Sequence, residues 1–263
     1  MAKIGIIGGS GLDNPAILEN AEEIVLATPF GTPSSPITCG RISGVEVAIV
    51  ARHGCRHTIY PTAVNFRANI RALKDLGCTH ILATTACGSL KEEIKPGHLV
   101  ILDQFVDRTT KRVSTFYDKD QVCHIPTGDP FCPKLRGLLA DGARRLGLDH
   151  HPRGTVVTIE GPRFSTKAES NLFRSWGCDV INMSTVPEAV LAREAALCYA
   201  SIAMSTDYDC WHETEEHVTI AMILEIMEKN ADNVIRLMLD VIPRIQYHDC
   251  SCREFIKTAV VGG

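Results

Sequence analysis

The sequence lacks the features that would place it in a membrane or on a nucleic acid. No apolar run among its 263 residues approaches the roughly 18 residues that a membrane span needs. The net charge is only −4 at pH 7, so no strong overall field attracts nucleic acid or an anionic lipid surface. No charged segment leads into an apolar stretch with a small-residue cleavage site. We therefore expect a cytoplasmic protein that has neither a membrane nor a nucleic acid as its partner.

Internal repeats, low-complexity tracts and linkers are absent as well. The length suits one large domain or two small ones, and no stretch rich in proline, glycine and serine divides the chain. Hydrophobic residues make up 45% and charged residues 22%, which is ordinary for a soluble globular protein. We therefore expect residues 1–263 to form a single domain.

Cysteine, by contrast, is plentiful, with 11 residues. Secreted disulfide scaffolds are usually short, and this chain is not. Several of the cysteines lie in apolar surroundings, where a free thiol behaves as a small hydrophobic group. Only Cys250-Ser251-Cys252, close to His248, stands out by its spacing. This motif is compatible with a disulfide, a redox pair or a weak metal site, but we favour a surface tail with two free thiols.

Strands and helices alternate along the chain, which is typical of an α/β fold with a largely parallel sheet. Several of the strands are continuous apolar runs, as expected where helices cover both faces of a sheet. The expected strands are Lys3–Ile7, Val45–Arg52, His80–Thr85, Leu99–Asp103, Thr155–Ile159, Asp179–Asn182 and Tyr199–Thr206. The expected helices are Ala63–Leu76, Pro133–Leu146, Lys167–Trp176, Pro187–Ala196 and Thr219–Ile242. The irregular, charged stretch Thr109–Thr127 is expected to be a loop.

Two carboxylates, Asp207 and Asp209, follow the last expected strand. Residues i and i+2 of an extended segment point to one side, so both are expected to reach one pocket. Two close carboxylates resist ionising together, so one of them is expected to hold a proton near neutral pH. Such a pair can donate to N7 of adenine and accept from its exocyclic amine. The alternative is a solvated loop that happens to carry two acids.

Three other strands end on residues suited to binding an anion. The turn Gly8-Gly9-Ser10-Gly11 offers backbone N–H groups and a hydroxyl, although it fits neither the P-loop nor the dinucleotide fingerprint. Arg52 and His53 end a second strand, and Thr84–Ser89 ends a third. Ligands bind at the carboxyl ends of parallel strands, so together these donors predict a phosphate site that needs no metal. Each motif alone is compatible with an ordinary turn or a surface side chain.

Two loops that follow later strands carry candidate substrate contacts. Phe164 is suited to stacking on a base, Met183 to packing against a ribose, and Ser184 to adding a hydroxyl beside the phosphate. Ordinary packing is the alternative for each of them.

Two other kinds of catalytic site have little support in the sequence positions of the residues that they would need. Cys87 is a possible nucleophile with His53 or His57 as its base, but nothing fixes that geometry. His212 and His217 are five residues apart, whereas a zincin needs two histidines four apart on one helix face. We therefore reject a metalloprotease.

The complete set of motifs resembles the 5′-methylthioadenosine phosphorylases, which belong to the trimeric branch of the purine nucleoside phosphorylases. The resemblance runs from about residue 3 to about residue 243 and rests on Ile6–Gly11, Ala51–Gly54, Thr84–Ser89, Thr158–Phe164, Asn182–Glu188 and Ala203–Trp211. It implies a nucleoside phosphorylase fold, with a central mixed, largely parallel β-sheet flanked by α-helices. It also implies a homo-oligomer, either a trimer or a dimer of trimers.

The resemblance assigns roles to individual residues. It implies phosphate contacts at Ser10, Arg52, His53, Thr85, Ala86 and Ser184. It implies substrate contacts at His57, His124, Phe164, Met183, Asp207, Asp209, Ile220, Ile223 and Leu224. The last three would line a methylthio pocket on the last helix, and a neighbouring subunit would supply His124. Ser10 and Ser184 stand where the family carries threonine, and the Cys-Ser-Cys end resembles archaeal members.

The implied reaction is phosphorolysis of 5′-methylthioadenosine to adenine and 5-methylthioribose 1-phosphate, in purine and methionine salvage. Asp207 would protonate N7 as a general acid, a role worth roughly 10²–10⁴ in rate. Phosphate held close to C1′ is itself the nucleophile, so no cofactor, metal or protein nucleophile is expected. Two other classes remain as alternatives: a nicotinamide oxidoreductase and a purine-binding protein without catalysis.

Overall fold

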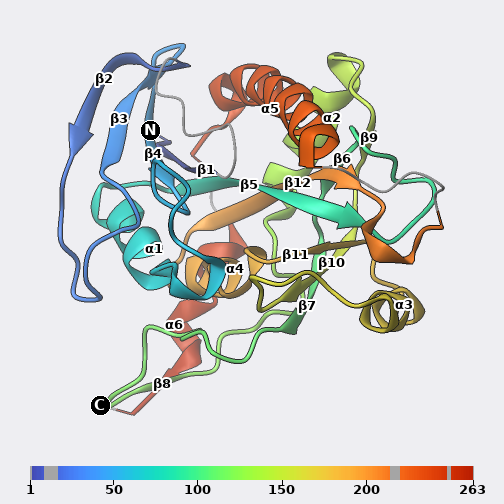
Figure 1. Ribbon diagram of the computed structural model, residues 1–263. Helices are drawn as coiled ribbons and strands as arrows, with labels where there is room; N and C mark the ends of the chain where they lie inside the picture. Colours follow the sequence, from blue (N-terminus) through green and yellow to red (C-terminus); the bar gives the residue numbers. More distant parts are fainter. Residues whose placement is uncertain (1, 9–16, 214–219, 248–249, 263) are drawn as a thin grey trace.

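The computed structural model describes residues 2–8, 17–213, 220–247 and 250–262, with the side chains of 220–224 left aside. Within these ranges, 11 strands form one sheet in the order β2-β3-β4-β1-β5-β11-β10-β7, while β12 pairs with β5 and continues to β6 and β9 (Figure 1). The strands are β1 Ile4–Gly8, β2 Glu19–Ile24, β3 Ile37–Ile42, β4 Val45–Ala51, β5 His80–Ser89, β6 Leu99–Ile101, β7 Gln104–Arg108, β9 His150–His151, β10 Thr155–Ile159, β11 Val180–Asn182 and β12 Cys198–Asp207. The α-helices are α1 Phe66–Asp75, α2 Pro133–Arg145, α3 Lys167–Ser175, α4 Thr185–Glu194, α5 Ile220–Val241 and α6 Ile256–Ala259.

The sheet is mixed and largely parallel, as predicted. Strands β4, β1, β5 and β12 run parallel to one another, so their carboxyl ends meet at one edge of the sheet. The antiparallel pairs are β2 with β3, β3 with β4, β11 with β5, and β6 with β12. All five residues of β1 are buried, which agrees with helices covering both faces. The shared edge is where the predicted site residues collect.

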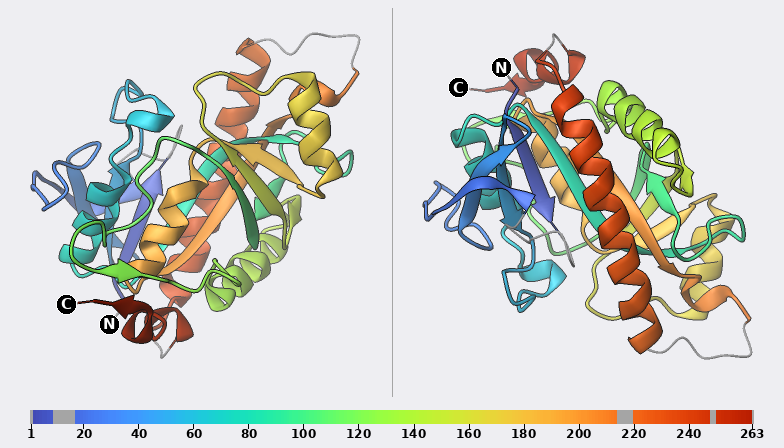
Figure 2. Two further views of the ribbon diagram at one scale, coloured as in Figure 1. Left: turned by 90° about the horizontal axis from the view of Figure 1, so that it is seen from below. Right: turned by 90° about the horizontal axis from the view of Figure 1, so that it is seen from above.

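Two helical layers enclose this sheet. Helices α2 and α5 pack together on one face, where apolar side chains of β1, β6 and β12 join theirs in one core cluster. Helices α1 and α4 pack on the other face, over a second cluster that includes β4 and β5. The long helix α5 crosses the sheet from one side to the other (Figure 2). This is the flanked sheet that the strand–helix alternation predicts.

Local signals fix the ends of several helices. The Thr166 hydroxyl accepts from the N–H of Glu169 at 3.2 Å, and the Glu169 carboxylate accepts from the N–H of Thr166 at 2.7 Å. This capping box starts α3. Gly77 follows α1 with a φ of +82°, and Gly147 follows α2 with a φ of +63°. Glycine adopts this left-handed conformation without steric cost, so both helices stop there.

All five expected helices and all seven expected strands are present, with ends shifted by a few residues. Strand β5 is four residues longer than expected because it continues through Gly88 to Ser89. The sequence analysis missed β2, which is largely exposed and carries four polar or acidic residues among its six. An exposed edge strand of this kind has no alternation of apolar and polar residues by which to recognise it. The short strands β3 and β7 were missed as well.

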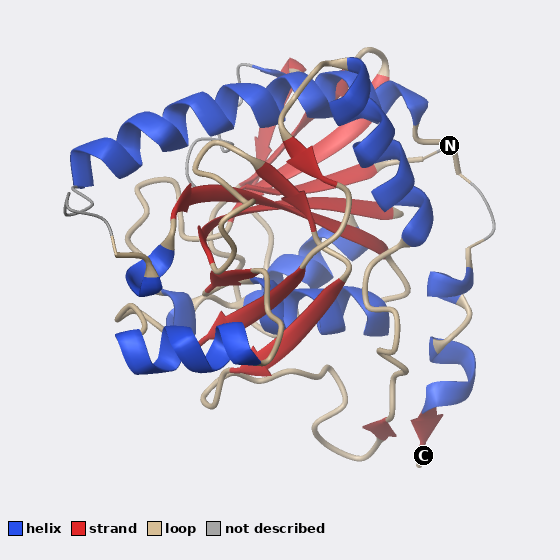
Figure 3. Cartoon of the chain, turned by 90° about the vertical axis from the view of Figure 1, so that its right-hand side faces the viewer, coloured by secondary structure: helices blue, strands red, loops and turns tan. Residues whose placement is uncertain are grey.

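The C-terminal segment corrects one interpretation of the sequence. Residues 250–262 fold back over the protein and include α6 and β13 (Val260–Val261), which pairs with β8 (Val122–Cys123) in the predicted Thr109–Thr127 loop (Figure 3). Cys250 and Cys252 are only 8% and 2% exposed. The interpretation as a surface tail is therefore wrong, because both cysteines pack into the cluster formed with α2 and β12.

Across the described ranges, no helix combines the length and apolar character needed to cross a bilayer.

Candidate active site

Asp207 lies at the carboxyl end of β12, beside Gly88 of β5. Its Oδ2 accepts from the Thr206 hydroxyl at 2.7 Å, and its Oδ1 accepts from the backbone N–H of Asp209 at 2.7 Å. A Cβ at Gly88 would meet Oδ1 of Asp207 at 3.2 Å and Cβ of Asp209 at 3.1 Å. The glycine therefore lets both acids approach the strand closely.

The expected proximity of Asp207 and Asp209 is present, but its geometric basis is different. The strand ends at Asp207, and Asp209 begins a 3₁₀ turn with a φ of +47° rather than continuing an extended segment. The Asp209 carboxylate accepts from the Ser165 hydroxyl at 3.0 Å. Ser165 therefore ties Asp209 to the loop that carries Phe164.

The pKa of Asp207 is raised above its ordinary value. Burial is the largest cause, because removal from water disfavours the carboxylate. The bonds from Thr206 and Asp209 N lower the pKa again, and the nearby charge of Asp209 raises it. A raised pKa is the direction expected for a carboxyl that retains its proton. The largest cause of the increase is burial, whereas the sequence predicted that the charge of the second acid would raise the pKa.

Three buried side chains form a polar cluster beside the second half of β5. The Thr85 and Ser184 hydroxyls lie 2.8 Å apart, although 99 residues separate them in sequence. The amide of Asn182 donates to the Thr85 hydroxyl at 3.2 Å, and its oxygen accepts from Thr158 at 2.8 Å. Ala86 is the next residue of β5 and is partly exposed. The predicted anion donors Thr85 and Ser184 are thus brought together, and Asn182 positions them.

Arg52 is held in a buried ion pair. Its Nε and Nη2 donate to the two carboxylate oxygens of Glu188, both at 2.8 Å, and its Nη1 donates to the carbonyl of Thr84 at 2.8 Å. The Tyr199 hydroxyl donates to the same carboxylate at 2.7 Å. Burial alone would lower the pKa of Arg52, but Glu188 raises it overall. Among the residues that the structure describes, three of the five guanidinium N–H groups have partners, which leaves one on each terminal nitrogen for an anion.

His53 is prepared as a neutral imidazole. Its Nδ1 lies 2.8 Å from the carbonyl oxygen of Ile59, so Nδ1 must carry the proton and donate it. Burial, followed by the charge of Arg52, lowers the pKa of His53 to about 4. Its ring lies 4.6 Å from that of His57, which is exposed at the turn. The Nε2 atom of His53 is therefore a hydrogen-bond acceptor at neutral pH.

Glu160 joins three loops on the substrate side. Its carboxylate accepts from the Thr62 hydroxyl at 2.7 Å, from the N–H groups of Thr110 and Lys111 at 2.6 and 2.9 Å, and from Arg112 Nε at 3.2 Å. Arg112 also donates to the carbonyl of Val186 at 2.6 Å. Burial works against ionisation, but these bonds together lower the pKa of Glu160 to about 2.

Replacing Glu160 by glutamine should flatten the acid limb of the stability curve. The folded pKa of about 2 lies below the ordinary 4.5, so the carboxylate stabilises the fold above pH 4.5 and loses this contribution as the pH falls towards 2. Denaturant titrations from pH 6 to pH 2 should show the two proteins converging in unfolding free energy. Glu22→Gln on exposed β2 serves as the control for net charge. A gap between wild type and Glu160→Gln that is independent of pH would contradict the assignment.

Met183 and Phe164 occupy the loops that follow β11 and β10. Gly161 has a φ of +67°, and a Cβ there would meet the Met183 sulfur at 2.5 Å, so the glycine allows this close packing. Phe164 is 77% exposed. An aromatic ring left this open on one chain is available to a ligand or to a second subunit.

Several predicted residues lie elsewhere or outside the described ranges. His124 is exposed next to β8, and its N–H donates to the carbonyl of Ala259 at 2.8 Å. Asp207 ends β12, and Figure 1 shows β8 far from that strand. Ser10 falls outside the described residues, as do the side chains of Ile220, Ile223 and Leu224 on α5. Their predicted roles stay predictions.

The alternative of a Cys87 nucleophile finds no support. Cys87 is 3% exposed, and burial together with the charge of Asp207 raises the pKa of its thiol well above the ordinary value. A thiol of this kind does not form the thiolate that nucleophilic attack requires.

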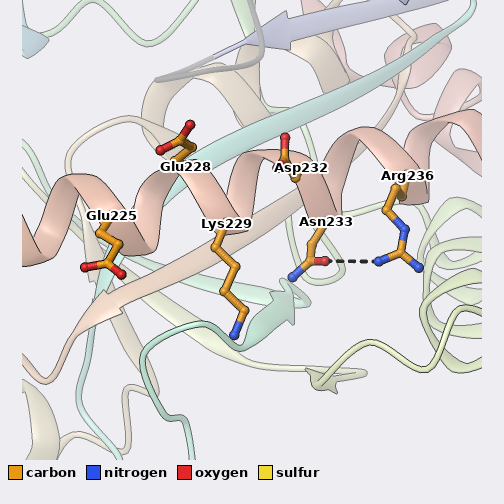
Figure 4. Close-up of a pocket in the computed structure, with 6 residues that line it drawn as sticks. All are labelled: Glu225, Glu228, Lys229, Asp232, Asn233 and Arg236. Atoms are coloured by element: carbon orange, nitrogen blue, oxygen red, sulfur yellow. Dashed lines mark hydrogen bonds between the residues drawn. The ribbon is translucent and has the colours of Figure 1, made fainter.

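A hollow elsewhere on the described surface is a weaker candidate for a binding site. It follows the exposed side of α5 and is lined by Glu225, Glu228, Lys229, Asp232, Asn233 and Arg236 (Figure 4). All six side chains come from one helix, so no donors from different elements converge there. One group of possible metal ligands, four buried cysteines, lies at the opposite end of β12.

The residues that hold the site together are not evident from the sequence. Glu188 and Tyr199 fix Arg52, Asn182 fixes Thr85, and Ser165 fixes Asp209. A signal existed for Glu188, because an acid among the apolar residues of α4 needs a buried partner. No comparable signal marks Ser165.

Known proteins match this chain over most of its length. A family model of the phosphorylase superfamily matches residues 3–243. An S-methyl-5′-thioadenosine phosphorylase of Danio rerio is 59% identical over 248 residues, covering 92% of this chain and 89% of its own. One of Xenopus tropicalis is 58% identical over 253 residues, covering 94% and 90%.

Solved structures agree with these sequence matches. A methylthioadenosine phosphorylase of Schistosoma mansoni in complex with adenine has a TM-score of 0.94 at 41% identity, covering 98% of this chain and 99% of its own. A mutant adenosine/methylthioadenosine phosphorylase of the same organism, in complex with methylthioadenosine, has a TM-score of 0.93 at 40% identity, covering 98% of each chain. The chain therefore belongs to the phosphorylase superfamily, within the family of S-methyl-5′-thioadenosine phosphorylases.

Proposed function

We propose that this chain catalyses the phosphorolysis of 5′-methylthioadenosine to adenine and 5-methylthioribose 1-phosphate. The observation that carries the proposal is one sheet edge that holds both a buried carboxyl with a raised pKa, Asp207, and a cluster of anion donors, Thr85 and Ser184. A reaction that adds phosphate and expels a purine needs these two features side by side. The relatives named above carry this activity in their names.

On this proposal Asp207 protonates the leaving base. Negative charge builds on the purine as the glycosidic bond stretches, and a proton delivered to N7 neutralises it. A carboxyl whose pKa is raised by burial keeps that proton closer to neutral pH than an exposed acid does. Asp209, held by Ser165, would then accept from the 6-amino group.

The phosphate would lie among Thr85, Ser184 and the two uncommitted N–H groups of Arg52. Ser184 directly precedes α4 and brings its hydroxyl to the buried Thr85 hydroxyl. Because Nε2 of His53 only accepts, it would bind a phosphate oxygen that carries a proton. Ser10 would complete the set from the glycine-rich turn. Holding the nucleophile against C1′ removes much of the entropic cost of attack.

A substrate panel tests the proposed specificity. With phosphate present, methylthioadenosine and adenosine should release free adenine, whereas inosine and guanosine should be poor substrates. Faster turnover of inosine than of methylthioadenosine would overturn the assignment of the base. Tight adenine binding without any turnover would favour a purine-binding protein instead.

The proposal includes a homotrimer, or a dimer of trimers, in the cytoplasm, with the whole chain as a single domain and no cofactor or metal in the reaction. Two exposed residues support the proposal that each active site is built from two subunits. Phe164 lies uncovered beside the proposed base site, and His124 projects from a loop that is remote from it on the same chain. A neighbouring subunit could bring a His124 to each site.

Mixing two impaired variants tests whether one subunit supplies His124 to the active site of its neighbour. His124→Ala and Asp207→Asn should each be impaired alone, whereas mixed oligomers should regain activity because some sites then combine an intact Asp207 with a neighbour's intact His124. Refolding the two proteins separately before mixing, without subunit exchange, is the control. Activity of the mixed oligomers equal to the average of the two parents would show that His124 serves its own chain or none.

A further inference from the structure

Four cysteines from three separate segments meet in one buried cluster. Cys132 precedes α2, Cys198 begins β12, and Cys250 and Cys252 lie in the C-terminal segment. Their Sγ atoms all lie within 4.8 Å of one another. All four are buried, and each is a free thiol. We call Cys132, Cys198, Cys250 and Cys252 the four-cysteine cluster.

The spacing of the sulfurs fits coordination to a single ion. A tetrahedral site with zinc–sulfur bonds of about 2.3 Å places its sulfurs about 3.8 Å apart. The Sγ atoms of Cys132 and Cys250 are 3.8 Å apart. A disulfide needs about 2.05 Å, so these sulfurs stand at the distance of two ligands and not of a bonded pair. The other sulfur pairs lie within 4.8 Å, and four sulfur ligands would complete a tetrahedron around one ion.

We propose that the four-cysteine cluster binds one Zn²⁺ ion as a structural tetrathiolate site. Four cysteine ligands in a closed tetrahedron are typical of structural zinc, whereas catalytic zinc keeps one position open. Soft thiolates select zinc over magnesium or calcium. A cysteine pair separated by one residue supplies two of the ligands from a single turn.

This site is separate from the proposed active site. Cys198 begins β12 and Asp207 ends it, so the ten-residue strand separates the two sites. At about 3.3 Å per residue, that separation is roughly 30 Å. The inference therefore concerns the architecture of the chain, and it does not alter the metal-free reaction proposed above.

The surroundings of the cluster suit a charged metal centre. Binding releases one proton from each thiol, so four cysteines and one Zn²⁺ give a site of charge −2 and four protons. Cys132 occupies the N-cap of α2, where the helix dipole favours a thiolate. A surface hollow lined by Phe131, Pro133, Ser251 and Cys252, among others, reaches the edge of the cluster. The cluster therefore lies close to the surface on the side of Cys252.

Zinc at this position would fasten the C-terminal segment to the core. Cys132 directly precedes α2 and Cys198 begins β12, whereas Cys250 and Cys252 precede α6 and β13. β13 pairs with β8, and the carbonyl of Ala259 accepts from the N–H of His124. The metal would thus stabilise the support on which the His124 loop rests.

Metal analysis of the reduced wild-type protein tests the proposal. Protein prepared without chelators should contain about one zinc per chain, and after zinc removal it should bind about one Co²⁺ with the intense absorption of tetrahedral cobalt thiolates. Cys250→Ser combined with Cys252→Ser should lower the zinc content at least about tenfold. Cys178→Ser, which removes a buried thiol outside the cluster, should leave it unchanged.

Several outcomes would overturn the inference. One is a reduced wild-type protein that binds neither Zn²⁺ nor Co²⁺ at about one per chain. Another is zinc that the double variant retains or that Cys178→Ser loses equally. A third is a cluster isolated as two disulfides whose reduction restores no metal binding. The wild-type measurements need no variant to fold, and all readouts are independent of phosphorolysis.

Discussion

Asp207→Asn should lower the phosphorolysis of methylthioadenosine by about 10²-fold or more, within the range for loss of a general acid. The asparagine amide cannot transfer a proton to N7. It presents a fixed NH₂ and a fixed carbonyl, which suit a 6-oxopurine better than adenine. Sites that leave buried polar groups unpaired reject the wrong ligand strongly. Activity on inosine should therefore be retained or should rise.

The rival explanation is that Asp207 only supports its loop. Its carboxylate does accept from the N–H of Asp209 and from Thr206, so the structure gives it such bonds. In that case both substrates should lose activity in parallel, and the melting temperature should fall with them. Specificity constants for both nucleosides, measured beside a thermal melt, separate the two explanations. Near-native turnover of methylthioadenosine by the variant would refute the catalytic role.

Glu188→Gln should destabilise the fold by about 3–5 kcal/mol, the usual cost of breaking a buried ion pair. Arg52 is 2% exposed and Glu188 is fully buried. The substitution leaves a buried guanidinium without its counter-charge, and the new NH₂ group faces the donors of Arg52. Denaturant midpoints at one fixed protein concentration provide the measurement, because assembly would add a concentration-dependent contribution.

Tyr199→Phe is the matched control for this effect. It removes one hydrogen bond to the same carboxylate, at 2.7 Å, and leaves both charges in place. The expected loss is about 1.5–3 kcal/mol, the range for a hydrogen bond to a charged group. If Glu188→Gln proved no more destabilising than Tyr199→Phe, the ion pair would not be the dominant support of Arg52.

The location of the site at one edge of the sheet could be predicted from the sequence, because it depends only on the direction of the strands. Parallel strands bring their carboxyl ends together, so the ends of β5 and β12 had to meet once both strands were recognised, and Asp207 lies beside Gly88. The local conformation of Asp209 could not be predicted in this way. Its left-handed φ depends on a turn that the extended-strand rule does not describe.

Contacts between distant segments were the main omission. The partners Arg52 and Glu188 are 136 residues apart, and no periodicity links them. Nothing in the sequence links the Cys-Ser-Cys motif to Cys132 and Cys198, because both lie far from it along the chain. Only the return of the C-terminal segment to α2 and β12 places all four thiols together.

Release of adenine from methylthioadenosine, measured with and without phosphate, tests the central claim most directly. Protein freed of bound phosphate should release no adenine above background in a phosphate-free buffer. Added phosphate should restore release, with 5-methylthioribose 1-phosphate formed in equal amount, and arsenate should substitute for it. Equal release of adenine in the absence of phosphate, with free methylthioribose as the product, would show a hydrolase and contradict the proposed function.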